Sequence, residues 1–112
     1  MIIVFTSKGT DWDSVIDPRF GRTDYLCVYD EEKDEMTSID NRDIANDAHG
    51  AGPKTAQLIF GVKPDVLITG NGPGGNAETV LKKLDLKILI KAGDMTLKEA
   101  YKAFKDNGLT EF

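Results

Sequence analysis

Short apolar runs alternate with helix-like patterns along this chain, and this alternation constrains the fold more than any other feature. Ile2–Phe5 and Val66–Ile68 are continuous apolar runs, which are typical of strands covered on both faces. A further strand pattern, Lys87–Ile90, follows a second helical stretch. Strands joined through helices in this way run parallel, because each helix crosses over one face of the sheet. The alternation therefore predicts an α/β fold.

A predicted hairpin supplies two more strands. Tyr25–Tyr29 is typical of a second strand, Glu31–Asp34 of a turn, and Glu35–Ile39 of an edge strand. This hairpin must flank the parallel strands. With strands numbered along the chain, the simplest order is 3-2-1-4-5 with strand 2 antiparallel. We therefore expect a mixed sheet of five strands with three helices on its two faces, which makes three α/β/α layers.

Two helices are predicted around the middle of the chain from the signals at their ends. Gly50–Pro53 introduces the first helix, with the proline near its first position, and Gly61 ends it. The second helix covers Ala77–Leu84, with Asn76 as its N-cap.

The last predicted helix begins with a capping box. Thr96 and Glu99 have the capping-box spacing, and the apolar residues that follow keep helical spacing as far as Gly108, which is the expected stop. The polar stretch Asn41–His49 is predicted to be a loop.

Length, charge and cysteine content restrict the class of protein. At 112 residues we expect a single domain over residues 1–112. The net charge of −5 argues against a nucleic-acid partner, which would require a basic face. One cysteine allows neither an internal disulfide nor a Cys₄ site, and it suits a reducing compartment. The first apolar run is too short for a signal peptide or a membrane span, so we expect a cytoplasmic protein without membrane attachment.

A glycine-rich loop, Gly70–Asn76, joins the Val66–Ile68 strand to the second helix. Its backbone N–H groups, with no side chains in the way, suit an anion or an electron-rich cluster. The same glycines also suit a tight turn. Ligands of open α/β sheets bind at the carboxyl ends of the strands, and this loop leaves such an end. Both interpretations stay open.

A second loop, Ser7–Arg22, leaves the carboxyl end of the first strand. Because the first and fourth strands are predicted neighbours, both loops would leave the same edge of the sheet. Arg19 and Arg22 would then add full positive charge to a shared site, and its guest would be an anion. The alternative is that these arginines only pair with surface carboxylates.

The remaining candidate ligands do not form a metal site. His49 is the only histidine, and a lone histidine cannot hold a metal ion, although it could contact an anion. Cys27 lies inside a strand pattern, where a buried hydrophobic role competes with that of a thiolate ligand. Asp11, Asp13 and Asp17 lack the spacing of a calcium loop and are expected to be solvated.

Catalytic patterns are missing from the sequence. A nuclease of the ribonuclease H type needs carboxylates on central strands, but here those strands have the sequences IIVF and VLI. No nucleophile elbow, phosphate-binding loop with lysine, or cysteine–histidine pattern occurs. We therefore expect a binding domain and not an enzyme.

Three stretches together resemble a known family. They are SKGTDWDSVIDPRFGRTDYLCVYD at Ser7–Asp30, HGAG at His49–Gly52 and LITGNGPGGNA at Leu67–Ala77, and the most specific part is Arg19–Arg22. Over nearly the whole chain the sequence resembles the dinitrogenase iron–molybdenum cofactor family of NifX-like and NifB C-terminal-type domains. The resemblance implies a ribonuclease H-like α/β/α fold. It also implies binding, carriage or insertion of iron–sulfur-type cofactor precursors.

One position departs from the nitrogenase-associated members, which commonly carry a histidine where this chain has Arg19; the chain is more similar to stand-alone members. An arginine cannot ligate a metal, but it can pair with an anionic cluster. The candidate cofactor-binding residues are Arg19, Phe20, Gly21, Arg22, His49, Gly50, Gly52, Asn71, Gly72, Gly74, Gly75 and Asn76.

Two functions remain open. The first is a carrier for an iron–sulfur or iron–molybdenum-type cofactor precursor, with cluster-assembly or acceptor proteins as partners. The alternative is a regulatory or interaction domain that binds a small anion or another protein. We expect a monomer or a weak dimer, because the edge strand Glu35–Ile39 invites pairing while the charges of Glu35 and Asp40 discourage it.

Overall fold

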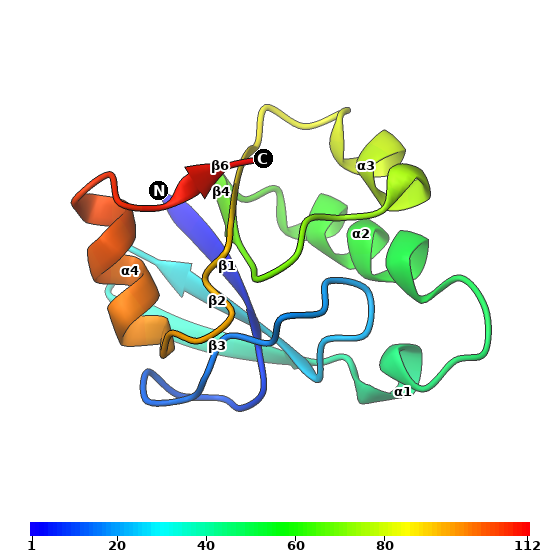
Figure 1. Cartoon of the computed structure of the whole chain (residues 1–112), viewed down its shortest axis with the longest axis horizontal. Coiled ribbons are helices and arrows are strands. Elements are labelled where there is room, and N and C mark those ends of the chain that lie inside the picture. Colours follow the sequence, from blue (N-terminus) through cyan, green and yellow to red (C-terminus); the bar gives the residue numbers. More distant parts are fainter.

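The computed structural model describes all 112 residues and contains one six-stranded sheet in the order β3-β2-β1-β4-β5-β6 (Figure 1). The strands are β1 (Ile2–Ser7), β2 (Tyr25–Asp30), β3 (Glu35–Asp40), β4 (Val66–Ile68), β5 (Lys87–Ile90) and β6 (Thr110–Glu111). β1, β4 and β5 pair in parallel, and every other pairing is antiparallel. The predicted mixed α/β fold and the order of its first five strands are confirmed.

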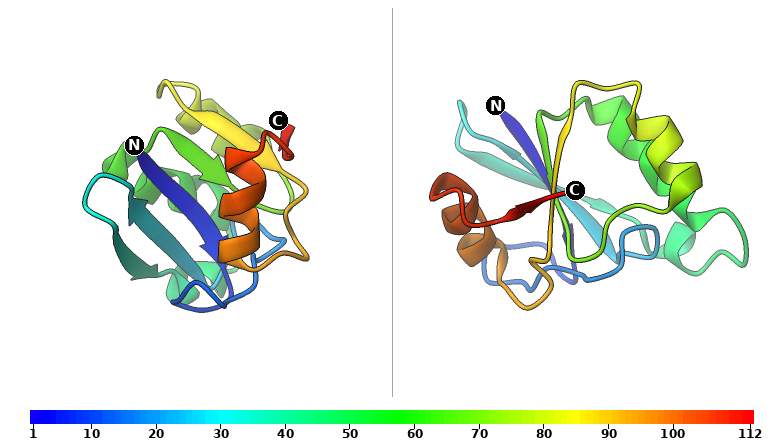
Figure 2. Two further views of the ribbon diagram at one scale, coloured as in Figure 1. Left: turned by 90° about the vertical axis from the view of Figure 1, so that its left-hand side faces the viewer. Right: turned by 45° about the horizontal axis from the view of Figure 1, so that its top comes forward.

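Helices cover both faces of the sheet (Figure 2). They are α1 (Arg42–Ala45), α2 (Ala51–Val62), α3 (Gly75–Leu81) and α4 (Leu97–Lys105). α2 and α3 pack side by side on one face, and α4 lies on the other. None of the four combines the length and the apolar character that crossing a bilayer requires.

The central strand β1 feeds a separate hydrophobic core on each face of the sheet. Ile3 and Phe5 pack in the cluster that contains Leu97 of α4, whereas Val4 packs in the cluster that contains Ile59 of α2. All five side chains are fully buried, and each contributes about 1.5–3 kcal/mol by leaving water. The period-two alternation of a strand produces this division, which explains why the first run is apolar at every position.

The expectation of five strands and three helices was wrong, because the structure has six strands and four helices. β6 pairs antiparallel with β5, so Lys87–Ile90 is not the last strand. Two polar residues, Thr110 and Glu111, are too few to produce a strand pattern in a sequence. Likewise, the predicted loop Asn41–His49 contains the four-residue helix α1, which has no apolar face long enough to reveal it.

The first two helix boundaries also differ from the predicted ones. α2 continues through Gly61 and ends at Val62, because Lys63 adopts the left-handed conformation that stops the helix. α3 begins at Gly75, with Gly74 as its N-cap, and ends at Leu81. Asn76 therefore lies inside the first turn and is not the N-cap.

At α4 the predicted capping box is confirmed, since Thr96 and Glu99 exchange both hydrogen bonds. The helix ends at Lys105, before Gly108. The left-handed residue that follows is Asn107, with φ of 58°, and the Gly108 N–H donates to the Ala103 carbonyl at 2.7 Å. Gly108 thus closes the helix end without supplying its left-handed residue.

Candidate functional site

The loops that follow β1, β4 and β5 leave the same edge of the sheet, which we call the carboxyl edge (Figure 1). They comprise residues 8–24, 69–74 and 91–96. The parallel register, with Phe5 opposite Ile68 and Ile68 opposite Leu89, places the three strand ends next to one another. Open α/β sheets bind their ligands at such an edge.

Pro18 brings the first and second of these loops into direct contact. The Asn71 N–H donates to the Pro18 carbonyl at 2.8 Å. A Cβ atom on Gly70 would lie 2.5 Å from the Pro18 Cα atom, so any larger residue at position 70 would force the two backbones apart. The Gly70 carbonyl also accepts from the Lys91 N–H at 2.7 Å, which ties in the third loop. Gly70 is therefore required by packing.

A second close approach brings the predicted segments together. A Cβ atom on Gly21 would lie 2.6 Å from the Gly52 Cα atom, and one on Gly52 would lie 3.7 Å from the Cβ atom of Ala77. The Thr55 hydroxyl further ties α2 to the first loop by donating to the Gly21 carbonyl at 2.8 Å. The Phe20–Arg22 segment, the start of α2 and the start of α3 thus meet at one place, although the sequence did not determine how far the α2 segment lies from the others.

Arg19 forms a bidentate ion pair with Asp17. Its Nε and Nη2 atoms each lie 3.1 Å from a carboxylate oxygen of Asp17, and Asp24 lies 3.9 Å away. The expectation that Asp17 is solvated was wrong, because its side chain is fully buried. The hydrogen bond with Asp17, and then its charge, raise the pKa of Arg19 above the ordinary value. The Arg19 side chain remains 53% exposed, so it can still face a ligand, but its charge is largely compensated.

Arg22 and Phe20 have structural contacts of their own. Nη1 of Arg22 donates to the carbonyl oxygens of Ala45 at 2.7 Å and Asp47 at 2.9 Å, which holds the segment between α1 and α2. Arg22 is exposed and forms no ion pair, so its charge is uncompensated. Phe20 is buried in the core beneath α2 and α3 and does not face a ligand.

The segment before α2 is exposed, with one conformational constraint. Gly50 has φ of 76°, the left-handed conformation that favours glycine, and its carbonyl accepts the first hydrogen bond of α2, from Lys54. His49 is exposed, and only its backbone N–H forms a hydrogen bond, to the Asp47 carboxylate at 3.4 Å.

The glycines at the end of the glycine-rich loop have no such constraint. No atom lies within 4 Å of a Cβ atom built on Gly74 or Gly75, and neither residue has a positive φ. Gly72 lies beneath the ring of Phe112. Asn71 and Asn76 are exposed. None of the glycines in this loop has a positive φ, so the loop does not use the left-handed backbone that glycine favours.

The sequence interpretation missed two lysines at this edge. Lys8 follows β1 and Lys91 follows β5, and both line a shallow hollow of about 340 Å³ with Pro18, Gly70, Asn71, Gly93 and Asp94. Both lysines are exposed and neither forms an ion pair. The sequence could have indicated both lysines as candidate ligand contacts, because each is the first residue after a strand that ends at this edge.

The protein offers no set of side chains that could ligate a metal. No group of three histidine, cysteine, aspartate or glutamate side chains comes together. Cys27 is buried, its thiol donates to the Gly9 carbonyl at 3.3 Å, and burial raises the pKa of that thiol. A guest at the carboxyl edge would therefore be held by charge and hydrogen bonds, without protein ligands.

Comparisons with known proteins agree with this architecture. The apo form of the orange protein from Desulfovibrio gigas is 29% identical, with a TM-score of 0.90 over 99% of this chain and 92% of that one. A NifB-like protein from Thermotoga is 33% identical, with a TM-score of 0.81 over 98% of this chain and 91% of that one. No curated protein sequence matches. The family model described as dinitrogenase iron–molybdenum cofactor matches residues 1–107, and the chain belongs to this family.

Proposed function

We propose that this protein is a small, non-catalytic carrier that holds an anionic iron–sulfur or iron–molybdenum-type cofactor precursor at its carboxyl edge. Membership of the family indicates a role connected with such cofactors. The observation that carries the proposal is that Lys8, Arg22 and Lys91 all lie in loops at this edge, because all three are exposed and none has an acidic partner. The cluster is cargo in this proposal.

The proposed mode of binding is electrostatic. Lys8, Arg22 and Lys91 carry uncompensated positive charge, and Arg19 offers donors beside its partner Asp17. The exposed backbone of Gly74 and Gly75 allows close approach, because no side chain covers it. We propose that His49, Gly50 and Gly52 form one side of this binding site. Outer contacts of this kind let the cargo leave intact, since no protein–metal bond has to break.

A carrier of this kind also has to transfer the cofactor precursor to a partner protein. A carrier releases its cargo to cluster-assembly or acceptor proteins, and we propose that these are the partners, in the cytoplasm. We propose a single domain over residues 1–112 that is monomeric or weakly dimeric, since the exposed edge of β3 carries Glu35 and Asp40 at its ends.

A second candidate function is a regulatory domain that senses a small inorganic anion. The pairing of Arg19 with a buried carboxylate favours this candidate, because it compensates the charge of Arg19, which a highly charged cluster would otherwise use. A small anion would fit the hollow beside Lys8 and Lys91.

Anaerobic incubation with iron, sulfide and molybdate, followed by gel filtration, separates the two candidates. The carrier proposal expects charge-transfer absorption that travels with the protein and is lost at high salt, since the contacts are ionic. In the variants Lys8→Ala and Lys91→Ala, retention should weaken about tenfold. Lys33→Ala is the matched control, because Lys33 is exposed, forms no ion pair and lies in the β2–β3 turn at the opposite edge. A colourless protein that still binds molybdate would support the sensor instead.

A further inference from the structure

The ring of Phe112 lies directly over Gly72 in the glycine-rich loop. A Cβ atom on Gly72 would come within 2.2 Å of the Phe112 Cε1 atom and 2.4 Å of its Cδ1 atom. Phe112 is 48% exposed, and its ring also lines an apolar hollow with Leu81, Leu84, Leu86 and Ile88. A segment more than thirty positions away in the sequence therefore touches the candidate site.

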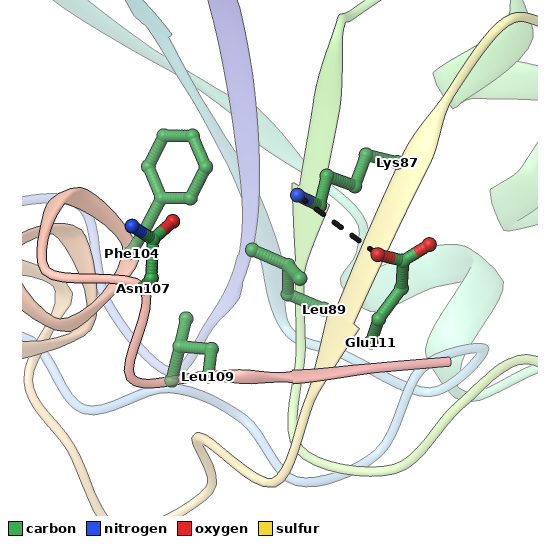
Figure 3. Close-up of a pocket in the computed structure, with 6 residues that line it drawn as sticks. All are labelled: Lys87, Leu89, Phe104, Asn107, Leu109 and Glu111. Carbon is green, nitrogen blue, oxygen red and sulfur yellow. Dashed lines mark ion pairs between the residues drawn. The ribbon is translucent and has the colours of Figure 1, made fainter.

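Two anchors hold this ring in place. The Phe112 N–H donates to the Ile88 carbonyl at 2.8 Å, beside the pairing of β6 with β5. On the other face of the sheet, Leu109 packs toward Leu89 and Phe104 (Figure 3). The anchoring segment is nevertheless slight, since β6 has two residues, both exposed, and its Lys87–Glu111 ion pair spans 3.9 Å at the surface.

The loop beneath the ring has few restraints of its own. Asn71 is fixed by its hydrogen bond to Pro18, and regular hydrogen bonding resumes at the first turn of α3. Between these points the N–H groups of Gly72 and Gly74 donate to no protein atom, and Pro73 has no N–H to donate. Pro73 is buried, so the segment is restrained by that residue and by the Phe112 ring.

We infer that Phe112 is a positioning residue that orders the glycine-rich loop for binding. The inference rests on the proposed function, because it concerns the same site. Glycine leaves the loop free to move, and ordering it in advance reduces the entropy lost on binding. When the ring is displaced, residues 72–74 become mobile and the guest is released more easily.

Backbone ¹⁵N relaxation tests the ordering without any ligand. In Phe112→Ala, the order parameters of the Gly72, Gly74 and Gly75 N–H vectors should fall from about 0.85, which is typical of a rigid backbone, to below about 0.6. The order parameters in β1 and β4 should stay unchanged. Thr110→Ala is the matched control, since it shortens another exposed side chain of the same segment and keeps the β6 backbone. Phe112→Leu should give intermediate values.

A double-mutant cycle separates contact from general destabilisation. In the wild-type background, Gly72→Ala should displace the ring and lower the order parameters of the loop, whereas in the Phe112→Ala background the same substitution should have no further effect. Additive effects, or unchanged order parameters in Phe112→Ala, would overturn the inference.

Molybdate titration then connects the ordering to binding. The Phe112→Ala variant should bind about tenfold more weakly, mainly through faster dissociation. If wild-type protein binds neither molybdate nor a cluster, the proposed function fails while the relaxation data still decide whether Phe112 orders the loop. If wild-type and Phe112→Ala bind equally, Phe112 has no positioning role.

Discussion

Glycines occur in two parts of the carboxyl edge for different reasons. Gly21 and Gly70 sit where two backbones approach so closely that a Cβ atom would lie within 2.7 Å of backbone atoms. Gly74 and Gly75 have ordinary backbone conformations and open space around them. Packing explains the first pair completely and the second not at all. In a glycine-rich motif, the glycines that packing requires therefore have to be separated from the unconstrained ones, because only the unconstrained ones point to a binding site.

The largest effect is expected at the packed glycines. Gly70→Ala should destabilise the protein by about 2–3 kcal/mol, because the new methyl group collides with the Pro18 backbone and cannot move aside. Gly21→Ala should behave similarly against Gly52. Urea unfolding followed by circular dichroism measures both changes. Wild-type stability in either variant would show that the close approach of the two backbones does not require glycine.

Two aspartate–arginine pairs of identical spacing provide a matched test of the arginine at the edge. Arg19 and Arg42 each bind, in bidentate fashion, the aspartate two positions earlier, but Asp17 is fully buried whereas Asp40 is exposed. Arg19→Ala should cost about 1–2 kcal/mol, because it strips the main partner from a buried carboxylate and the half-exposed arginine limits the effect.

The corresponding Arg42→Ala variant should unfold at nearly the same urea concentration as the wild-type protein, since exposed ion pairs contribute little. Equal midpoints for the two variants would show that burial of Asp17 does not matter.

Smaller effects are expected at the open glycines. Gly75→Ala should leave stability unchanged or raise it by up to about 1 kcal/mol, because Gly75 begins α3 and alanine restricts the unfolded chain. Thermal unfolding measures the change. A loss of stability as large as that of Gly70→Ala would contradict the division between the two groups.

The pH response of the exposed pair is the smallest effect. The Arg42 hydrogen bonds lower the pKa of Asp40 from 3.8 to about 2. Because the carboxylate form is favoured in the folded state, the stabilisation is complete above pH 4 and is lost as the pH falls toward 2. Carboxyl chemical shifts should show a midpoint below 3.8, and in Arg42→Ala the midpoint should return toward 3.8. An unchanged midpoint in the variant would refute the assigned cause.

The sequence was sufficient to predict the parts of the fold that depend on buried apolar runs. Ile2–Phe5 and Val66–Ile68 were predicted as buried strands, and the simplest strand order made them neighbours, as the structure confirms. β6 and α1 were missed because elements of two and four residues have no readable period.

At the candidate site, the sequence predicted which segments take part, but it did not predict the contacts between them. The glycines alone did not reveal that Gly21 packs on Gly52 or that Phe112 covers Gly72, because both contacts join distant parts of the chain. Lys8 and Lys91 were overlooked because isolated lysines form no motif, although each directly follows a strand.

Mapping amide chemical shifts during a molybdate titration shows directly whether the carboxyl edge binds an anion. We predict saturable shifts at Lys8, at residues 19–22 and 71–76, and at Lys91, with none at the β2–β3 turn around Lys33. Shifts that cluster elsewhere, or a spectrum unchanged at millimolar molybdate, would show that the anion does not bind at this edge.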